Sequence, residues 1–221
     1  MTISESLPRV KRPNSLKEIA FKTIKDSIIK GSLVCGEIYS ENFISKNLGI
    51  SKTPVHEALL ELSHKGFLII LPKKGFLVKD LSEKEIRDIY GYRLALEKHV
   101  ILHVIEKIMK KDFTFLESIL HKLKECNDIK KFLEEDIRFH RSLAGLAAND
   151  QIINALGEIW DLCIWVGFRT LSTQYGTNGV LDEHVAILDS IKTKDPFRAQ
   201  AAIEKHINNS LDKILGTYHY T

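Results

Sequence analysis

Residues 41–64 contain two short helical segments separated by a glycine-led break, and this spacing restricts the folds open to the chain. "ENFISKNL" ends before Gly49, and "KTPVHEALLELSH" begins after Ser51. Serine is a favoured helix N-cap and glycine tolerates the positive φ of a tight turn, so Ser40, Gly49 and Ser51 bound the two helices. The apolar stripe of the second helix consists of Val55, Ala58, Leu59 and Leu62. A helix-turn-helix pair is predicted.

The flanking segments extend this pair to a winged helix-turn-helix. Upstream, "SLKEIAFKTIKDSIIKG" predicts a helix that begins after Ser15 and stops near Gly31. Its expected stripe consists of Leu16, Ile19, Ala20, Ile24, Ser27 and Ile28. Downstream of Gly66, the β-rich runs "FLIIL" and "GFLVK" are joined by the tripeptide 72–74, which predicts a hairpin.

The pattern changes after Asp80. Ser82 and Glu85 form a capping box, and the chain beyond them shows helical periods with almost no strand signal. The predicted helices span 83–109, 112–125, 128–146, 150–174, 179–193 and 196–216. The predicted fold class is mainly α. A winged helix-turn-helix of three helices and a β-hairpin occupies residues 1–79, with a flexible arm at 1–14. An all-α bundle of about six helices occupies residues 80–221.

The distribution of charge favours a nucleic-acid partner. Residues 1–80 carry 13 Lys and Arg against 8 Asp and Glu, whereas the whole chain has a net charge of only +3. Such a basic third is typical of nucleic-acid binders, although an excess of this size also arises by chance. The three cysteines have no CxxC spacing, no signal peptide is present, and no apolar run reaches the roughly 18 residues of a membrane span. A cytoplasmic protein without membrane contact is predicted.

The polar opening of the second short helix suits contact with a polyanion. In helix-turn-helix proteins this helix enters the major groove N-terminus first, and its first-turn N–H groups and hydroxyls bind phosphate. The residues placed for such contacts are Ser51, Lys52, Thr53 and His56 on the helix, and Lys73 and Lys74 on the hairpin. Each feature alone has a simpler explanation, because serine caps helices in any protein and a Lys-Lys turn is commonly just solvated.

The helical part contains a carboxylate and three histidines that together suit a divalent metal. Asp136 and His140 stand at i, i+4 on one helix face, about 6 Å apart along the axis. His184 and His206 lie among apolar helical neighbours, so both are expected to point into the bundle. Three imidazoles and a carboxylate are suitable ligands for Zn, Ni or Mn. The alternative is a set of hydrogen-bonded core residues.

The stretch "GEIYSENFISKNLGISKTPVHEALLELSHKGFLIILPKKGFLV" resembles the DNA-binding domain of GntR-family transcription regulators. The helical remainder resembles the FCD ligand-sensing domain of the FadR subfamily, so the likeness covers nearly the whole chain. The resemblance implies a non-enzymatic repressor that binds a palindromic operator in double-stranded DNA as a homodimer. It also implies DNA contact by Gly75 in the wing.

Three positions depart from the family pattern. Lys52 and His56 replace the two arginines of the recognition helix. Asn42, which is also an expected DNA contact, replaces a third arginine on the preceding helix. Lysine and histidine cannot reproduce the two-pronged hydrogen bonding of arginine to guanine or phosphate. The family's operator sequence therefore does not transfer unchanged.

The resemblance to FCD domains also implies the ligand sites. The metal ligands of that family match Asp136, His140, His184 and His206. Asn149 fits the loop position where that family often has Gly-Asn, and it is an expected effector contact. A small organic or sugar acid is expected to bind beside the metal. Arg93 and Arg169 are the candidates for clamping its carboxylate. For each arginine, a structural ion pair or a solvated surface charge is the alternative.

Two other functions remain open from the residues alone. A winged-helix module that binds protein instead of DNA would explain the missing arginines. A metal-dependent hydrolase would use Glu135 or Glu183 as general base, but each is adjacent to a metal-ligand candidate and points roughly 100° away from it on a helix. The chain contains no HExxH motif and no Gly-rich phosphate loop. A ligand-responsive regulator is the first expectation.

Overall fold

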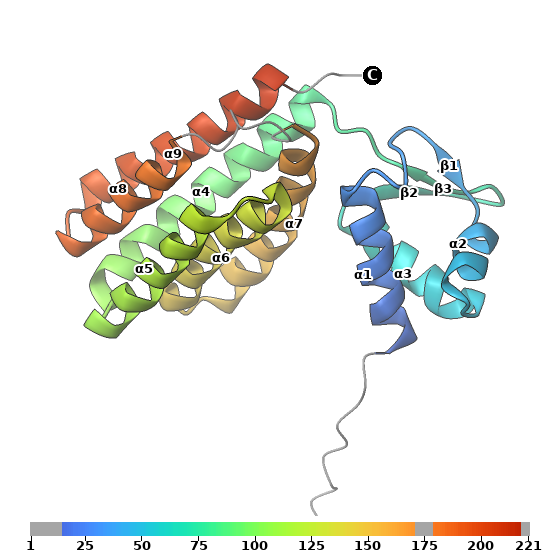
Figure 1. The fold of residues 1–221 in the computed structure, drawn as a ribbon, viewed down its shortest axis with the longest axis horizontal. Helices are drawn as coiled ribbons and strands as arrows, with labels where there is room; N and C mark the ends of the chain where they lie inside the picture. The colour runs from blue at the N-terminus through green and yellow to red at the C-terminus, as the bar shows by residue number, and fades with distance from the viewer. Residues whose placement is uncertain (1–14, 171–178, 218–221) are drawn as a thin grey trace, which may run out of the picture. The chain divides into compact units, whose positions relative to one another are not determined.

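The structure is a computed structural model that describes residues 15–170 and 179–217. The contacts among these residues define two compact units (Figure 1). The first contains most of the residues up to Lys79, and the second contains the residues from Asp80 onward.

The first unit is a winged helix-turn-helix, as predicted. It contains α1 (Leu16–Ile29), β1 (Ile38–Tyr39), α2 (Glu41–Leu48), α3 (Lys52–His64), β2 (Leu68–Leu71) and β3 (Gly75–Val78). The strands form an antiparallel sheet in the order β1-β3-β2, in which β2 and β3 are the predicted hairpin. Strand β1 was not predicted, because its two residues show no alternation and are extended only where they pair with β3.

The ends of α2 lie where the sequence places them because both caps are local. The Ser40 hydroxyl accepts a hydrogen bond from the Phe43 N–H, and Gly49 adopts a left-handed conformation with φ of 65°. Both ends of α2, the start at Ser40 and the turn into α3 at Gly49, are therefore fixed by residues that need no tertiary contact.

The apolar stripe predicted for α1 is only partly correct. Ala20, Ile24 and Ile28 are buried at i, i+4 spacing, whereas Leu16 and Ile19 are 52% and 46% exposed. The buried row therefore does not reach the first turn of the helix. The four-residue stripe predicted for α3 is fully buried.

Gly75 has a structural reason to be glycine. Its φ is 117°, a value that L side chains rarely adopt. A Cβ at this position would lie 2.1 Å from the carbonyl oxygen of Tyr39. Any side chain here would push β1 away from β3, so the wing depends on this residue whatever else it contacts.

The second unit is an all-α bundle, as predicted. Its helices are α4 (Glu83–Lys107), α5 (Lys110–Glu125), α6 (Ile129–Ala147), α7 (Asp150–Thr170), α8 (Val180–Lys192) and α9 (Pro196–Thr217). Residues 171–174 of the predicted fourth helix lie outside the described residues. None of the described helices combines the length and apolar character needed to cross a bilayer.

Helix α4 runs through the middle of this bundle and packs against α6, α7, α8 and α9 (Figure 1). The surrounding core is apolar and contains large side chains such as Trp160 and Phe139. Charged and imidazole side chains are buried within it, namely Arg93, Glu97, Asp136, His140, His184 and His206. Buried polar groups of this kind are costly unless they are paired with each other or with a ligand.

Candidate functional site

The structure brings the four predicted metal ligands together. Asp136 and His140 come from α6, His184 from α8 and His206 from α9. One ligand atom of each side chain lies within 4.8 Å of those of the others, and all four residues are buried. The helical spacing of the first pair and the inward-facing stripes of the other two helices produce this convergence.

The three imidazoles approach one another through their Nε2 atoms. His140 Nε2 lies 3.1 Å from His206 Nε2 and 3.2 Å from His184 Nε2. Asp136 Oδ1 lies 3.3 Å from His184 Nε2. Four potential ligand atoms therefore surround one point between three helices.

The opposite ring nitrogens each face an oxygen acceptor. His140 Nδ1 lies 2.6 Å from Glu97 Oε2, and His206 Nδ1 lies 2.9 Å from Glu183 Oε2. His184 Nδ1 lies 2.7 Å from the carbonyl oxygen of Val180. A neutral imidazole carries one proton, so protonation at each Nδ1 leaves three Nε2 lone pairs facing one another. These lone pairs repel unless a cation lies between them.

The electrostatics of the cluster favour the protonation states that bind metal. Burial lowers the pKa of His184 to about 4, although the Asp136 carboxylate opposes this shift. Burial, together with the imidazoles of His184 and His140, holds the pKa of His206 well below its usual value. Burial alone would raise the pKa of Asp136, but the neighbouring histidines lower it. Near neutral pH, these two imidazoles are unprotonated and the carboxylate is ionised, as metal ligands must be.

The metal-free protein is expected to lose stability as the pH falls from about 6.5 to about 4. In this window the unfolded chain protonates His184 while the folded chain does not, so acid favours unfolding, on the order of 3 kcal/mol for this residue. Urea unfolding of chelated protein at several pH values measures the effect. The His184→Gln variant should show a smaller decline. A flat wild-type profile across this window would contradict the assignment.

Two acidic residues contact the cluster in a way that was not predicted from the sequence. Glu97 contacts His140, and Glu183 contacts His206 and also accepts a hydrogen bond from Asn209 Nδ2 at 2.7 Å. The spacing of Arg93 and Glu97, at i, i+4 on α4, was the one signal in the sequence that pointed to a paired carboxylate.

Arg93, a predicted effector contact, is buried and already paired. Its Nε donates to Glu97 Oε1 at 2.8 Å, and the residue is 2% exposed. Its Nη2 is buried without a hydrogen-bond partner among the described residues. A guanidinium donor buried in this state is costly, which favours an anionic partner that the protein itself does not supply.

The other two predicted effector contacts have local partners. Arg169 forms an ion pair with Asp80 at 2.8 Å. The Asn149 side chain accepts a hydrogen bond from the Ile152 N–H at the start of α7 and is exposed. Both arrangements match ordinary structural roles, and effector binding by Arg169 and Asn149 stays a prediction.

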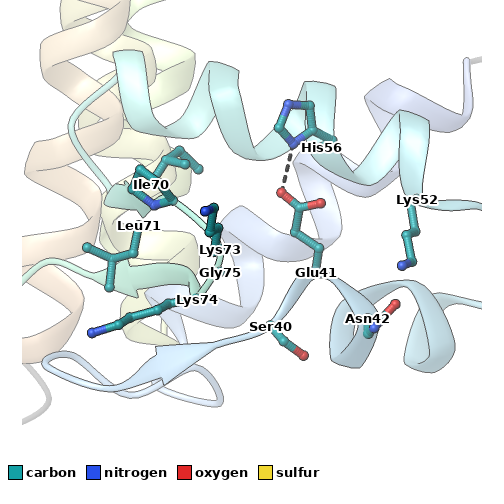
Figure 2. Close-up of a pocket in the computed structure, with 11 residues that line it drawn as sticks. Ser40, Glu41, Asn42, Lys52, His56, Ile70, Leu71, Lys73, Lys74 and Gly75 are labelled. Carbon is teal, nitrogen blue, oxygen red and sulfur yellow. Dashed lines mark hydrogen bonds and ion pairs between the residues drawn. The ribbon is translucent and has the colours of Figure 1, made fainter.

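In the first unit, a groove of about 350 Å³ lies between the helix-turn-helix and the wing (Figure 2). Its lining residues are Ser40, Glu41, Asn42, Lys52, His56, Ile70, Leu71, Pro72, Lys73, Lys74 and Gly75. Six of the eight residues predicted to contact DNA belong to this lining. The other two, Ser51 and Thr53, are exposed at the start of α3. The Ser51 side chain makes no capping hydrogen bond.

Glu41 is an unpredicted member of this groove. Its Oε1 lies 2.7 Å from His56 Nδ1, so an acidic residue of α2 is paired with the histidine of α3 (Figure 2). The pair orients the imidazole within the groove. It also places a carboxylate beside Lys52 and the wing lysines, on a surface that is otherwise suited to phosphate.

Comparison with known proteins matches both units. Residues 16–78 match the family described as "Bacterial regulatory proteins, gntR family", and residues 88–209 match the FCD domain. The gluconate operon transcriptional repressor of Bacillus subtilis (strain 168) is 30% identical over 199 residues, which cover 85% of this chain and 80% of the repressor. The HTH-type transcriptional repressor GlaR of Escherichia coli (strain K12) is 23% identical over 199 residues, covering 85% and 90%.

Solved structures share the architecture. E. coli McbR/YncC superposes with a TM-score of 0.80 at 18% identity, covering 94% of this chain and all of that one. A transcriptional regulator from Rhodococcus sp. RHA1 gives a TM-score of 0.78 at 19% identity, covering 93% of this chain and all of that one. At these identities the likeness establishes the fold.

Proposed function

Because this chain belongs to the GntR family of bacterial regulators and carries an FCD domain, we propose that it is a metal-containing repressor controlled by a small acid. Family membership makes it a DNA-binding transcription regulator and not an enzyme. In the proposal, a homodimer binds a palindromic operator through the groove of the first unit. An organic or sugar acid held at a metal centre in the second unit sets the affinity for that operator.

The convergence of three imidazole Nε2 atoms on one carboxylate carries this proposal. With every Nδ1 facing an oxygen, the lone pairs of Asp136, His140, His184 and His206 are directed at one another. Zn, Ni or Mn fits this donor set. Bound there, the ion would supply a Lewis-acidic position for the carboxylate of the effector, while the protein supplies the ligands and the buried surroundings.

The hydrolase alternative lacks a suitable base. Glu183 is engaged by His206 and Asn209, and Glu135 pairs with Arg138 at 3.2 Å. Neither carboxylate is among the groups that converge at the metal-ligand cluster. This arrangement agrees with the regulatory function of the family.

A small carboxylate is the effector class that the second unit favours. Arg93 has a buried donor for which the described residues offer no hydrogen-bond partner. The metal ligands would also leave room in a divalent coordination sphere for an oxygen of the effector. The similarity to a protein named as a gluconate operon repressor is consistent with a sugar acid.

Mass spectrometry of the purified protein tests the effector. We expect denaturation to release a small carboxylic acid from the wild type and from an Arg87→Gln variant, whose exposed arginine pairs with Glu83, but much less from Arg93→Gln, which lacks the buried donor. The released acid should change operator affinity when it is added back. Finding no acid in the wild type, and no stabilisation by a panel of organic and sugar acids, would contradict this part of the proposal.

His56 is expected to contribute to operator binding from the groove, where Glu41 orients its imidazole through Nδ1. Fluorescence anisotropy with operator duplex measures the effect. His56→Ala should weaken binding, and His64→Ala, at the far end of α3, should leave it unchanged. Equal affinities for wild type and His56→Ala would show that His56 does not contact DNA.

A further inference from the structure

The carboxylate of Glu97 connects three helices inside the second unit without belonging to the metal-ligand cluster. Its Oε1 accepts hydrogen bonds from Arg93 Nε at 2.8 Å and from Trp160 Nε1 at 3.0 Å. Its Oε2 lies 2.6 Å from His140 Nδ1, an ion-pair distance at which the contact lacks the angle of a hydrogen bond. Glu97 is 4% exposed, so all three contacts are shielded from water. The hydrogen bonds from Arg93 and Trp160 thus fix the position of the carboxylate that contacts His140.

Glu183 has the corresponding position on the other side of the cluster. Its Oε2 lies 2.9 Å from His206 Nδ1, while Asn209 Nδ2 donates to its Oε1 at 2.7 Å. Each of the two carboxylates therefore uses one oxygen for a histidine and the other for a group that holds the carboxylate in place. His184 receives the same support from the backbone, through the carbonyl of Val180.

An oxygen at Nδ1 has two consequences for a metal-binding histidine. It keeps the proton on Nδ1, so that Nε2 presents a lone pair, and it makes the imidazole a stronger electron donor. The carboxylates also determine the net charge around the cluster. Without a cation, the carboxylates of Asp136, Glu97 and Glu183 oppose the guanidinium of Arg93, leaving an excess of negative charge that a divalent ion offsets.

We propose that Glu97 and Glu183 are positioning residues of the metal centre, which hold His140 and His206 with Nε2 directed at the ion. This inference rests on the proposed metal-dependent function. In this arrangement Arg93 has two roles, because it anchors Glu97 through Nε and keeps Nη2 for the anionic effector. The support for the metal therefore extends across α4 as well as the three helices that carry the ligands.

Zinc affinity, measured by competition with a chromophoric chelator, tests the proposal. Glu97→Gln and Glu183→Gln should each bind zinc about 10- to 100-fold more weakly than the wild type. Glu135→Gln is the matched control, because Glu135 is adjacent to the ligand Asp136 yet faces Arg138, so its affinity should equal that of the wild type. A folded Glu97→Gln protein that binds zinc as tightly as the wild type overturns the role of Glu97, and the same result for Glu183→Gln overturns that of Glu183.

Nitrogen-detected NMR of the imidazoles in the metal-free wild type needs no variant. We expect His140 and His206 in the Nδ1-protonated tautomer. If a variant fails to fold, this measurement tests the positioning role of the corresponding glutamate in its place. Either ring protonated at Nε2 near neutral pH would overturn the proposal for its carboxylate. A wild type that binds none of zinc, nickel and manganese would refute the proposed metal centre itself, which distinguishes that failure from failure of the positioning role.

Discussion

Removal of the metal is expected to lower the free energy of unfolding of the second unit by about 4 kcal/mol when the free metal had stood near 1,000 times its Kd. In the proposed site the ion would join α6, α8 and α9 through Asp136, His140, His184 and His206, and these four side chains converge only in the folded chain. Thermal or urea unfolding before and after chelation, followed by re-addition of Zn, measures the change.

Substitution of the ligands separates metal binding from general destabilisation. His184→Ala or His206→Ala should lose most of the metal, while the first unit stays folded. The control is His99→Ala, an exposed histidine of α4 outside the cluster, which should retain one ion per chain. Elemental analysis that finds no metal in wild-type protein never exposed to chelator would refute the site.

DNA affinity is expected to fall steeply with salt. Each phosphate contact lowers log K by about 0.9 per tenfold rise in salt, so six to ten contacts in a dimer correspond to a loss of about 10³- to 10⁵-fold between 50 and 200 mM. Lys52, Lys73 and Lys74 in the groove are the lysines expected to contribute. Anisotropy titrations over a series of salt concentrations yield the slope, and tight binding that is insensitive to salt would contradict the proposed interface.

The groove lysines should differ in the part of the DNA that they contact, which is base edges for Lys52 and the phosphate backbone for Lys73 and Lys74. Lys52→Ala should weaken binding and relax base preference, because the start of α3 is the part expected to face base edges. Lys73→Ala or Lys74→Ala should weaken binding similarly on all sequences and reduce the salt slope by about one per lost contact. Lys84→Ala, on the exposed start of α4 in the second unit, should leave both properties unchanged.

The parts of the fold that follow from local chemistry could be predicted from the sequence. The Ser40 side chain caps the start of α2, and the left-handed conformation of Gly49 ends that helix. Ser82 and Glu85 form a capping box at the start of α4. Strand β1 was missed because it exists only through its pairing with β3. The exposed start of α1 was mistaken for core because helical periodicity does not show how far a buried face extends.

In the candidate site, too, some residues could be predicted from the sequence and others depend on tertiary packing. Helical spacing and apolar neighbours predicted that the four candidate ligands point into the bundle, and the resemblance to FCD domains singled them out as a metal site. Their convergence is what the structure adds. Glu97 and Glu183 were missed as supporting groups, since glutamate on a helix is ordinarily solvent-facing and only the packing of α4 and α8 reveals their partners. The pairing of Glu41 with His56 likewise depends on how α2 meets α3.

Selection of duplexes from a random-sequence DNA library by the full-length, metal-loaded protein tests the central claim most directly. The account predicts enrichment of an inverted repeat, with one half-site for each winged helix-turn-helix of a dimer. Addition of the acid released from the purified protein should change the affinity for that repeat. A library that stays random after several rounds, or an enriched site that binds with the same affinity whether or not the acid is present, would contradict it.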